Sequence, residues 1–260
     1  MAPRAPVPTT TEVLCLSRSL CSVHDSTEAR SEVEAILLTM GDRPGALAEA
    51  RSSIEMQEGL NSPIRVVWNG ADPAAPSLSD LVLEENVGVP AGRNRGAEAA
   101  TAPLLLFLDD DARLESPRIL ASIAVMFERC PTLGAVALRL VDEHGDTSKR
   151  HVPRIGGRGP DVSGPVTAFL GGAVVIRRAA FEQVGGYGDE FFYAMEETDL
   201  SWRLIDAGWQ IEYRADLHVF HPRVEPTRHD GATRITARNR GSHGAIFPFR
   251  CRWLTSRYGS

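Results

Sequence analysis

The chain lacks any apolar run long enough to cross a bilayer. A membrane-spanning helix needs about 20 consecutive apolar residues, whereas the apolar runs here are short, such as residues 104–108. An apolar patch at residues 13–16 is broken by polar residues before the core of a signal peptide develops. We therefore expect no integral membrane segment and a cytoplasmic location, and we leave peripheral membrane contact open.

Cysteine is scarce and positive charge is in deficit. The four cysteines form no CxxC pair and no zinc-finger spacing, which is typical of reduced thiols. The 28 Lys and Arg residues are outnumbered by 34 Asp and Glu residues, giving a formal net charge of -6. Because a protein that binds nucleic acid usually presents a basic face, we expect no nucleic-acid partner.

The composition is otherwise that of a globular α/β protein. The chain is 43% hydrophobic and 24% charged, and its 260 residues are enough for one large domain. Residues 1–32 are rich in Pro, Thr and Ser, which predicts a flexible N-terminal extension. We expect one α/β domain over residues 33–222 and a separate C-terminal tail over residues 223–260.

Short apolar runs alternate with helical segments in the first half of this domain. The pattern predicts strands at residues 35–39, 64–68, 81–83 and 104–108, and helices at residues 46–57 and 92–101. This succession is typical of an open parallel sheet covered by helices. Ligands bind beyond the carboxyl ends of such strands, where Asp42, Asn69, Asn86 and three consecutive aspartates fall.

The second half of the domain is less regular. A helix is predicted near residues 117–129, a strand near 134–140, and a second helix from about residue 197. Between them lies a Gly- and Pro-rich loop at residues 154–165, which we interpret as a lid, followed by an apolar segment at 167–176.

Three adjacent carboxylates, Asp109, Asp110 and Asp111, end a hydrophobic strand. Like charges this close repel one another, and a divalent cation would compensate them. Alternate residues of an extended segment face the same way, so Asp109 and Asp111 are predicted to share a metal while Asp110 points elsewhere. The alternative is a solvated acidic turn that caps the next helix.

A second acidic group, Glu196 to Asp199, directly precedes a segment with helical spacing. Thr198 or Asp199 could simply cap this helix, whose first turn favours negative charge. The flanking aromatic residues favour another interpretation, in which they wall a cleft and tune one carboxylate into a general base. These residues are Phe191, Phe192, Tyr193 and Trp202.

Two further features are ambiguous on sequence alone. Alternation places His218 and His221 on different faces of a strand, so one could bind a metal while the other packs, although a structural role is the commoner one for a single histidine. The glycines of residues 86–96 do not have the G-x-G-x-x-G spacing of a dinucleotide site, which disfavours a dehydrogenase. Arg93 and Asn94 could approach a nucleotide or belong to a generic helix start.

Taken in order, these segments resemble the family 2 glycosyltransferases over residues 34–222. The resemblance is carried by residues 39–44, 86–96, 107–111, 169–172, 185–187 and 196–203, followed by His221. It implies a single-domain GT-A fold, with a Rossmann-like, mostly parallel sheet flanked by helices. It also implies a nucleoside-diphosphate sugar donor and a Mg²⁺ or Mn²⁺ cofactor.

The resemblance also assigns roles to residues. Glu197 becomes the catalytic base, although many relatives have Asp there, and the metal ligands become Asp109, Asp111 and His221. The implied donor-binding residues are Asp42, Asn86, Arg93, Asp109 and Asp110. The implied acceptor-side residues are Glu196, Asp199, Trp202 and Gly172. Residues 238–240 resemble the start of the helical tail of many relatives, but residues 241–260 do not continue the likeness.

The favoured hypothesis is an enzyme that transfers a sugar with inversion onto an acceptor hydroxyl, using a divalent cation. The acceptor, whether a glycan, a lipid-linked sugar or a small molecule, is not identified by the sequence. A non-catalytic module that binds nucleotide sugars is the main alternative. A nucleotidyltransferase is less favoured, since it leaves the acidic group at residues 196–199 unexplained.

Overall fold

The structure is a computed structural model that describes residues 32–153 and 159–223. The chain divides into two units, residues 1–30 and 31–260, and everything described below lies in the second. Most of the predicted N-terminal extension, residues 154–158 of the predicted lid and all but the first residue of the predicted tail lie outside the described residues.

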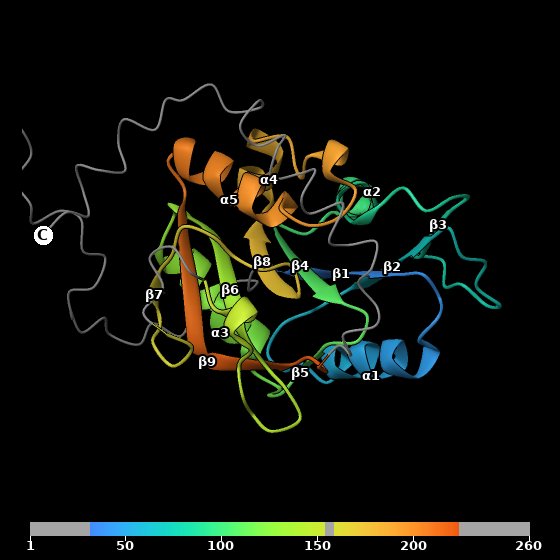
Figure 1. Ribbon diagram of the computed structural model, residues 1–260, viewed down its shortest axis with the longest axis horizontal. Helices are drawn as coiled ribbons and strands as arrows, with labels where there is room; N and C mark the ends of the chain where they lie inside the picture. Colours follow the sequence, from blue (N-terminus) through green and yellow to red (C-terminus); the bar gives the residue numbers. More distant parts are fainter. Residues whose placement is uncertain (1–31, 154–158, 224–260) are drawn as a thin grey trace, which may run out of the picture. The chain divides into compact units, whose positions relative to one another are not determined.

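The described residues contain nine strands in one mixed sheet (Figure 1). Its order is β3-β2-β1-β4-β8-β6-β9-β5, and β7 pairs with β9 away from this path. The strands are β1 (Val33–Thr39), β2 (Ile64–Asn69), β3 (Leu81–Leu83), β4 (Leu104–Asp109), β5 (Arg113–Leu114), β6 (Leu133–Val141), β7 (Gly164–Pro165), β8 (Ala173–Arg177) and β9 (Gln210–Phe220).

The strands predicted in the first half of the chain form the parallel part of this sheet. β1 pairs in parallel with both β2 and β4, and β2 pairs in parallel with β3. The chain runs outward from β1 to β3 and then returns to the other side of β1 for β4. Such a reversal of strand order opens a crevice at the carboxyl ends of the two central strands. The predicted parallel arrangement is confirmed here, whereas β8 runs antiparallel between β4 and β6.

Helices cover both faces of the sheet (Figure 1). On one face lie α1 (Pro44–Glu55) and α3 (Ile119–Arg129), and on the other lie α2 (Val89–Ala99), α4 (Arg178–Gln183) and α5 (Glu196–Asp206). Short 3₁₀ turns, η1 (Lys149–His151) and η2 (Asp189–Phe191), lie in the connections. Side chains of a strand alternate between faces, so Leu106 and Leu108 pack toward α1 and α3 while Leu105 and Phe107 pack toward the opposite helices.

The first two helices begin two or three residues earlier than the sequence pattern predicts. α1 starts at Pro44, and Pro90 occupies the first turn of α2. Proline fits the first turn of a helix because its missing N–H would have no partner there. The prolines therefore mark helix starts rather than the preceding loops.

A glycine allows α2 to lie close to the sheet. A Cβ at Gly96 would approach Ile36 Cγ2 to 2.5 Å and Val67 Cγ2 to 3.0 Å. Both atoms are methyl carbons of β-branched side chains and lie one bond from the Cβ, so they cannot move aside easily. We expect Gly96→Ala to lower the free energy of unfolding by about 1–3 kcal/mol through overpacking, as measured by denaturant titration.

The matched control is Gly45→Ala in α1, where nothing lies within 4 Å of the added Cβ. Because alanine favours helix over glycine by about 1 kcal/mol, this variant should be neutral or stabilised. Equal effects of the two substitutions would contradict the described packing of α2.

Within the described ranges, no helix has the length and hydropathy needed to cross a membrane.

Candidate active site

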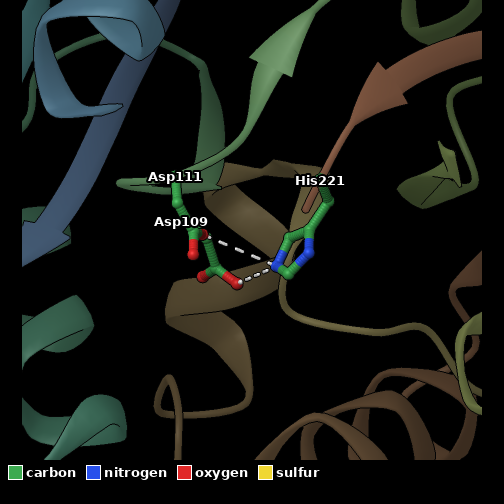
Figure 2. Close-up of side chains that lie close together, drawn as sticks. All are labelled: Asp109, Asp111 and His221. Carbon is green, nitrogen blue, oxygen red and sulfur yellow. Dashed lines mark ion pairs between the residues drawn. The ribbon is translucent and has the colours of Figure 1, made fainter. Parts of the chain in front are cut away.

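Two aspartates and a histidine converge at the carboxyl end of β4 (Figure 2). His221 Nε2 lies 3.4 Å from Asp109 Oδ2 and 3.6 Å from Asp111 Oδ1. One ligand atom from each residue falls within 4.8 Å of the others. Two carboxylate oxygens and one imidazole nitrogen form a donor set suited to a divalent cation such as Mn²⁺. The residues predicted as metal ligands are therefore brought together.

A bulge in β9 delivers His221 to this place. The pairing of β6 with β9 shifts from Leu138 with Arg214 to Arg139 with His218, so extra β9 residues bulge out between the two pairs. Bulges bend a strand and increase its twist. Beyond the bulge β9 also pairs with β5, and the His221 N–H donates to the Val141 carbonyl at 2.8 Å. The histidine thereby reaches β4 from a distant part of the chain.

His218 is directed elsewhere, as the alternation predicts. Its Nε2 lies 3.1 Å from the Ala215 carbonyl oxygen, within the bulge of its own strand. Its role there is local, since this bond helps to hold the bulge.

We expect His221→Ala to weaken Mn²⁺ binding more than His218→Ala. Loss of a residue that merely supports a metal ligand costs about 10–100-fold in affinity, and His221 is itself placed as a ligand. Titration calorimetry with Mn²⁺ alone measures both variants. The reverse ranking would make His218 the ligand.

The middle aspartate, Asp110, does not belong to this cluster of three possible ligands. It is only 2% exposed and accepts a hydrogen bond from Thr39 Oγ1 at 2.6 Å. The Arg43 guanidinium contacts both Asp110 and Asp111. Burial raises the pKa of Asp110, although Thr39 and Arg43 oppose this shift. Arg43 was not among the predicted site residues, and its only sequence signal is its place just after the first strand.

Arg93, from α2, lies near three carboxylates of the site. Its Nη2 donates to Asp109 Oδ1 at 2.8 Å and to the Gly171 carbonyl at 2.9 Å. Its Nη1 lies 3.8 Å from the Oε1 atoms of both Glu196 and Glu197. Burial would raise the pKa of Asp109, but His221 and Arg93 outweigh it and lower this pKa to about 2. Arg93 thus connects the aspartates with the second acidic group.

The two glutamates differ in exposure. Glu197 is 20% exposed and its Oε1 accepts a hydrogen bond from the Gly171 N–H at 3.1 Å, whereas Glu196 is 3% exposed. Burial and the neighbouring Glu197 hold the pKa of Glu196 well above its usual range. Of the pair, Glu197 is therefore the carboxylate more accessible to a substrate.

Two glycines permit this close arrangement. A Cβ at Gly172 would lie 2.8 Å from Leu140 Cδ1 and 3.5 Å from Asp109 Oδ2, and one at Gly171 would collide with Arg93 and Glu197. The Gly172 carbonyl also accepts a hydrogen bond from the Asp109 N–H at 3.1 Å. A side chain at Gly171 would therefore displace Arg93 and Glu197, and one at Gly172 would displace Leu140.

The segment before α5 has an unusual backbone. Phe192, Ala194 and Met195 all have positive φ, a conformation that side chains rarely adopt. The Phe192 carbonyl accepts a hydrogen bond from the Val89 N–H at 2.8 Å, which ties this segment to the start of α2. Helix α5 begins at Glu196, so Thr198 and Asp199 lie inside its first turn rather than at its cap.

The remaining predicted residues lie around this centre. Asn86 Oδ1 accepts hydrogen bonds from Asn69 Nδ2 and the Gly88 N–H, both at 2.9 Å. Asp42, about half exposed, follows β1. Asp199 forms an ion pair with Arg203 one turn along α5, and Trp202 on the same helix is half-buried. The structure thus groups Glu196 and Glu197 with Arg93, but it pairs Asp199 with Arg203.

The family model for glycosyl transferase family 2 matches residues 7–185. The chain belongs to this family. Two relatives are from Mycobacterium tuberculosis. An N-acetylglucosaminyl-diphospho-decaprenol L-rhamnosyltransferase is 35% identical over 79 residues, which are 30% of this chain and 26% of that protein. A pre-mycofactocin glycosyltransferase is 33% identical over 150 residues, which are 52% of this chain and 30% of that protein. The match therefore spans less than a third of either relative.

Solved structures share the fold at low sequence identity. The mannosyltransferase PcManGT from Pyrobaculum calidifontis, in complex with GDP-Man and Mn²⁺, has a TM-score of 0.62 at 20% identity, covering 89% of this chain and 68% of that one. TarS from S. aureus, in complex with UDP-GlcNAc, has a TM-score of 0.58 at 14% identity, covering 75% and 59%. The predicted GT-A fold is confirmed.

Proposed function

We propose that this chain transfers a sugar from a nucleoside-diphosphate sugar to an acceptor hydroxyl, through the domain at residues 33–222. The observation that carries the proposal is the convergence of Asp109, Asp111 and His221 beside an accessible carboxylate, Glu197, at the carboxyl ends of the strands. Family membership supports sugar transfer. The PcManGT complex with GDP-Man and Mn²⁺ supports this pairing of donor and cation.

The donor side would be built from the ends of β1, β3 and β4. Asp109, Asp111 and His221 would hold Mg²⁺ or Mn²⁺, which neutralises the charge of a leaving diphosphate. Asp42 and Asn86 lie where a nucleoside would rest beyond the strands. Asp110 is engaged by Thr39 and Arg43, so we infer that it contributes to donor binding by holding Arg43 in place.

The acceptor side would be built from α5 and the Gly171–Gly172 turn. Glu197 would take the proton of the acceptor hydroxyl, which then attacks the anomeric carbon in line with the departing diphosphate. A single displacement of this kind inverts the configuration at that carbon. The Gly171 N–H donates to Glu197 Oε1 and would orient this carboxylate, and the neighbouring Glu196 is more deeply buried. Gly172 leaves room beside Asp109, while Asp199 and Trp202 would shape the acceptor side of α5.

A panel of nucleotide sugars tests this function. The full chain is incubated in Mn²⁺ with UDP-GlcNAc, GDP-mannose or a nucleotide-activated rhamnose, and phosphorus NMR follows the products. Release of a nucleoside diphosphate is the expected result. Release of a sugar 1-phosphate would indicate transfer of the nucleotide, as by a nucleotidyltransferase, and binding without release would indicate a non-catalytic module.

A further inference from the structure

Three buried polar atoms around Arg93 lack a hydrogen-bond partner in the described part of the chain. They are Arg93 Nη1, Glu196 Oε2 and the Tyr187 hydroxyl oxygen. Buried polar groups in folded proteins are nearly always paired, so unpaired ones need a physical reason. Arg93 lies over the Tyr187 ring, with its Cζ 5.6 Å from the ring centroid, and its Nη1 is 3.8 Å from Glu196 Oε1. The unpaired atoms therefore belong to one cluster.

The two terminal nitrogens of the Arg93 guanidinium have different neighbours. Nη2 makes both of its hydrogen bonds toward Asp109 and the Gly171 carbonyl, on the side of the predicted cation site. Nη1 faces Glu196 and Glu197 at 3.8 Å, which is too long for a hydrogen bond. One buried positive charge thus serves three carboxylates, and it is hydrogen-bonded to only one of them.

We propose that Arg93 is a positioning residue that couples occupancy of the cation site to the protonation of the buried Glu196. The proposal rests on the proposed function, because it uses Asp109 as a cation ligand. When Asp109 binds a cation, its carboxylate depends less on Arg93. The charge of the guanidinium then acts more strongly on Glu196, and Glu196 releases a proton to the solvent.

The surroundings of the acidic pair support this coupling. Arg93 faces the pair from α2, and Tyr187 approaches it from the segment after α4 without a charge of its own. Asp199, on the helix of the pair, is held by Arg203. Burial and the mutual repulsion of the glutamates raise the pKa of Glu196, and Arg93 lowers it. Arg93 is therefore the positive charge that opposes protonation of Glu196.

The coupling would link the two sides of the site. Before the cation site is loaded, the buried Glu196 would keep a proton. Loading would ionise Glu196 and so add negative charge beside Glu197, the proposed base.

Proton release during Mn²⁺ binding tests the proposal without donor, acceptor or turnover. Calorimetry of the full chain with Mn²⁺ alone, near pH 7 in two buffers of different ionisation enthalpy, gives the number of protons released per ion bound. We expect Arg93→Gln and Glu196→Gln each to release fewer protons than the unmodified protein, by up to about one.

Arg43→Gln is the matched control. Arg43 also pairs with aspartates of the cation site, but its ion pairs run to Asp42, Asp110 and Asp111 and not to the glutamates. Arg43→Gln should therefore release as many protons per Mn²⁺ bound as the unmodified protein. Equal counts in all proteins, or an equal loss in Arg43→Gln, would overturn the coupling alone. If Arg93→Gln does not fold, an unchanged proton count in the near-isosteric Glu196→Gln would still overturn the coupling. Failure of the unmodified protein to bind Mn²⁺ would overturn both the coupling and the proposed cation site.

Discussion

Replacing Glu197 with glutamine should reduce sugar transfer by about 10²- to 10⁴-fold, the usual cost of losing a general base. The amide has nearly the same shape as the carboxylate, so it removes a proton acceptor without removing volume. Glu197 contacts the Gly171 N–H and Arg93 and is not one of the three clustered ligands, so Mn²⁺ and donor affinities should be largely unchanged. Initial rates, calorimetric affinities and the melting temperature are measured on the same variant.

Asp199→Asn is the control for this variant. Asp199 lies in the same first turn of α5 but forms an ion pair with Arg203, so its loss should lower stability more than turnover. If Glu197 only favours the helix start, Glu197→Gln would keep near-normal turnover and lose about 0.3–1 kcal/mol of stability. That result would remove Glu197 as the base and direct attention to Glu196 or Asp199.

Replacing Asp109 with asparagine should abolish donor binding along with cation binding. Removing a residue that only supports a metal ligand costs about 10–100-fold in metal affinity. Removing a ligand itself should therefore lower the affinity by more than about 100-fold. Without the cation, the remaining acidic side chains would repel a diphosphate of the same charge. Calorimetry with Mn²⁺, and then with the donor in the presence of Mn²⁺, measures both effects.

Asp42→Asn provides the comparison for Asp109→Asn. Asp42 is exposed at the end of β1 and is not one of the three clustered ligands. The Mn²⁺ affinity of Asp42→Asn should therefore match that of the unmodified protein. Its donor affinity should fall if it contacts the nucleoside. Unchanged Mn²⁺ binding in Asp109→Asn would disprove the ligand assignment.

The sequence predicts the first half of the fold well because the signals there are local. β1, β2, β3 and β4 are short apolar runs closed by turn residues, and buried parallel strands have this pattern. β9 is harder to predict, since it mixes polar and apolar residues and is interrupted by a bulge. The strands that pair with β9 determine where it begins and ends, and those strands lie far away in the sequence.

The candidate site shows the same division between local and distant signals. Alternation along β4 predicts that Asp109 and Asp111 share one side, and the structure groups both with His221 while Asp110 bonds to Thr39. The contacts of Arg43 with Asp111 and of Arg93 with Glu197 link separate elements, so no spacing in the sequence reveals them. The likeness to a family supplies the roles of single residues, and those roles remain predictions.

The most direct test of the proposed function is removal and restoration of the cation during turnover. With a donor identified from the panel, nucleoside-diphosphate release is followed in Mn²⁺, then with excess chelator, and then after Mn²⁺ is restored. We expect release to stop in chelator and to recover on restoration, and we expect no recovery in Asp109→Asn. A rate that is unchanged by the chelator would contradict a cation-dependent transferase built on Asp109, Asp111 and His221.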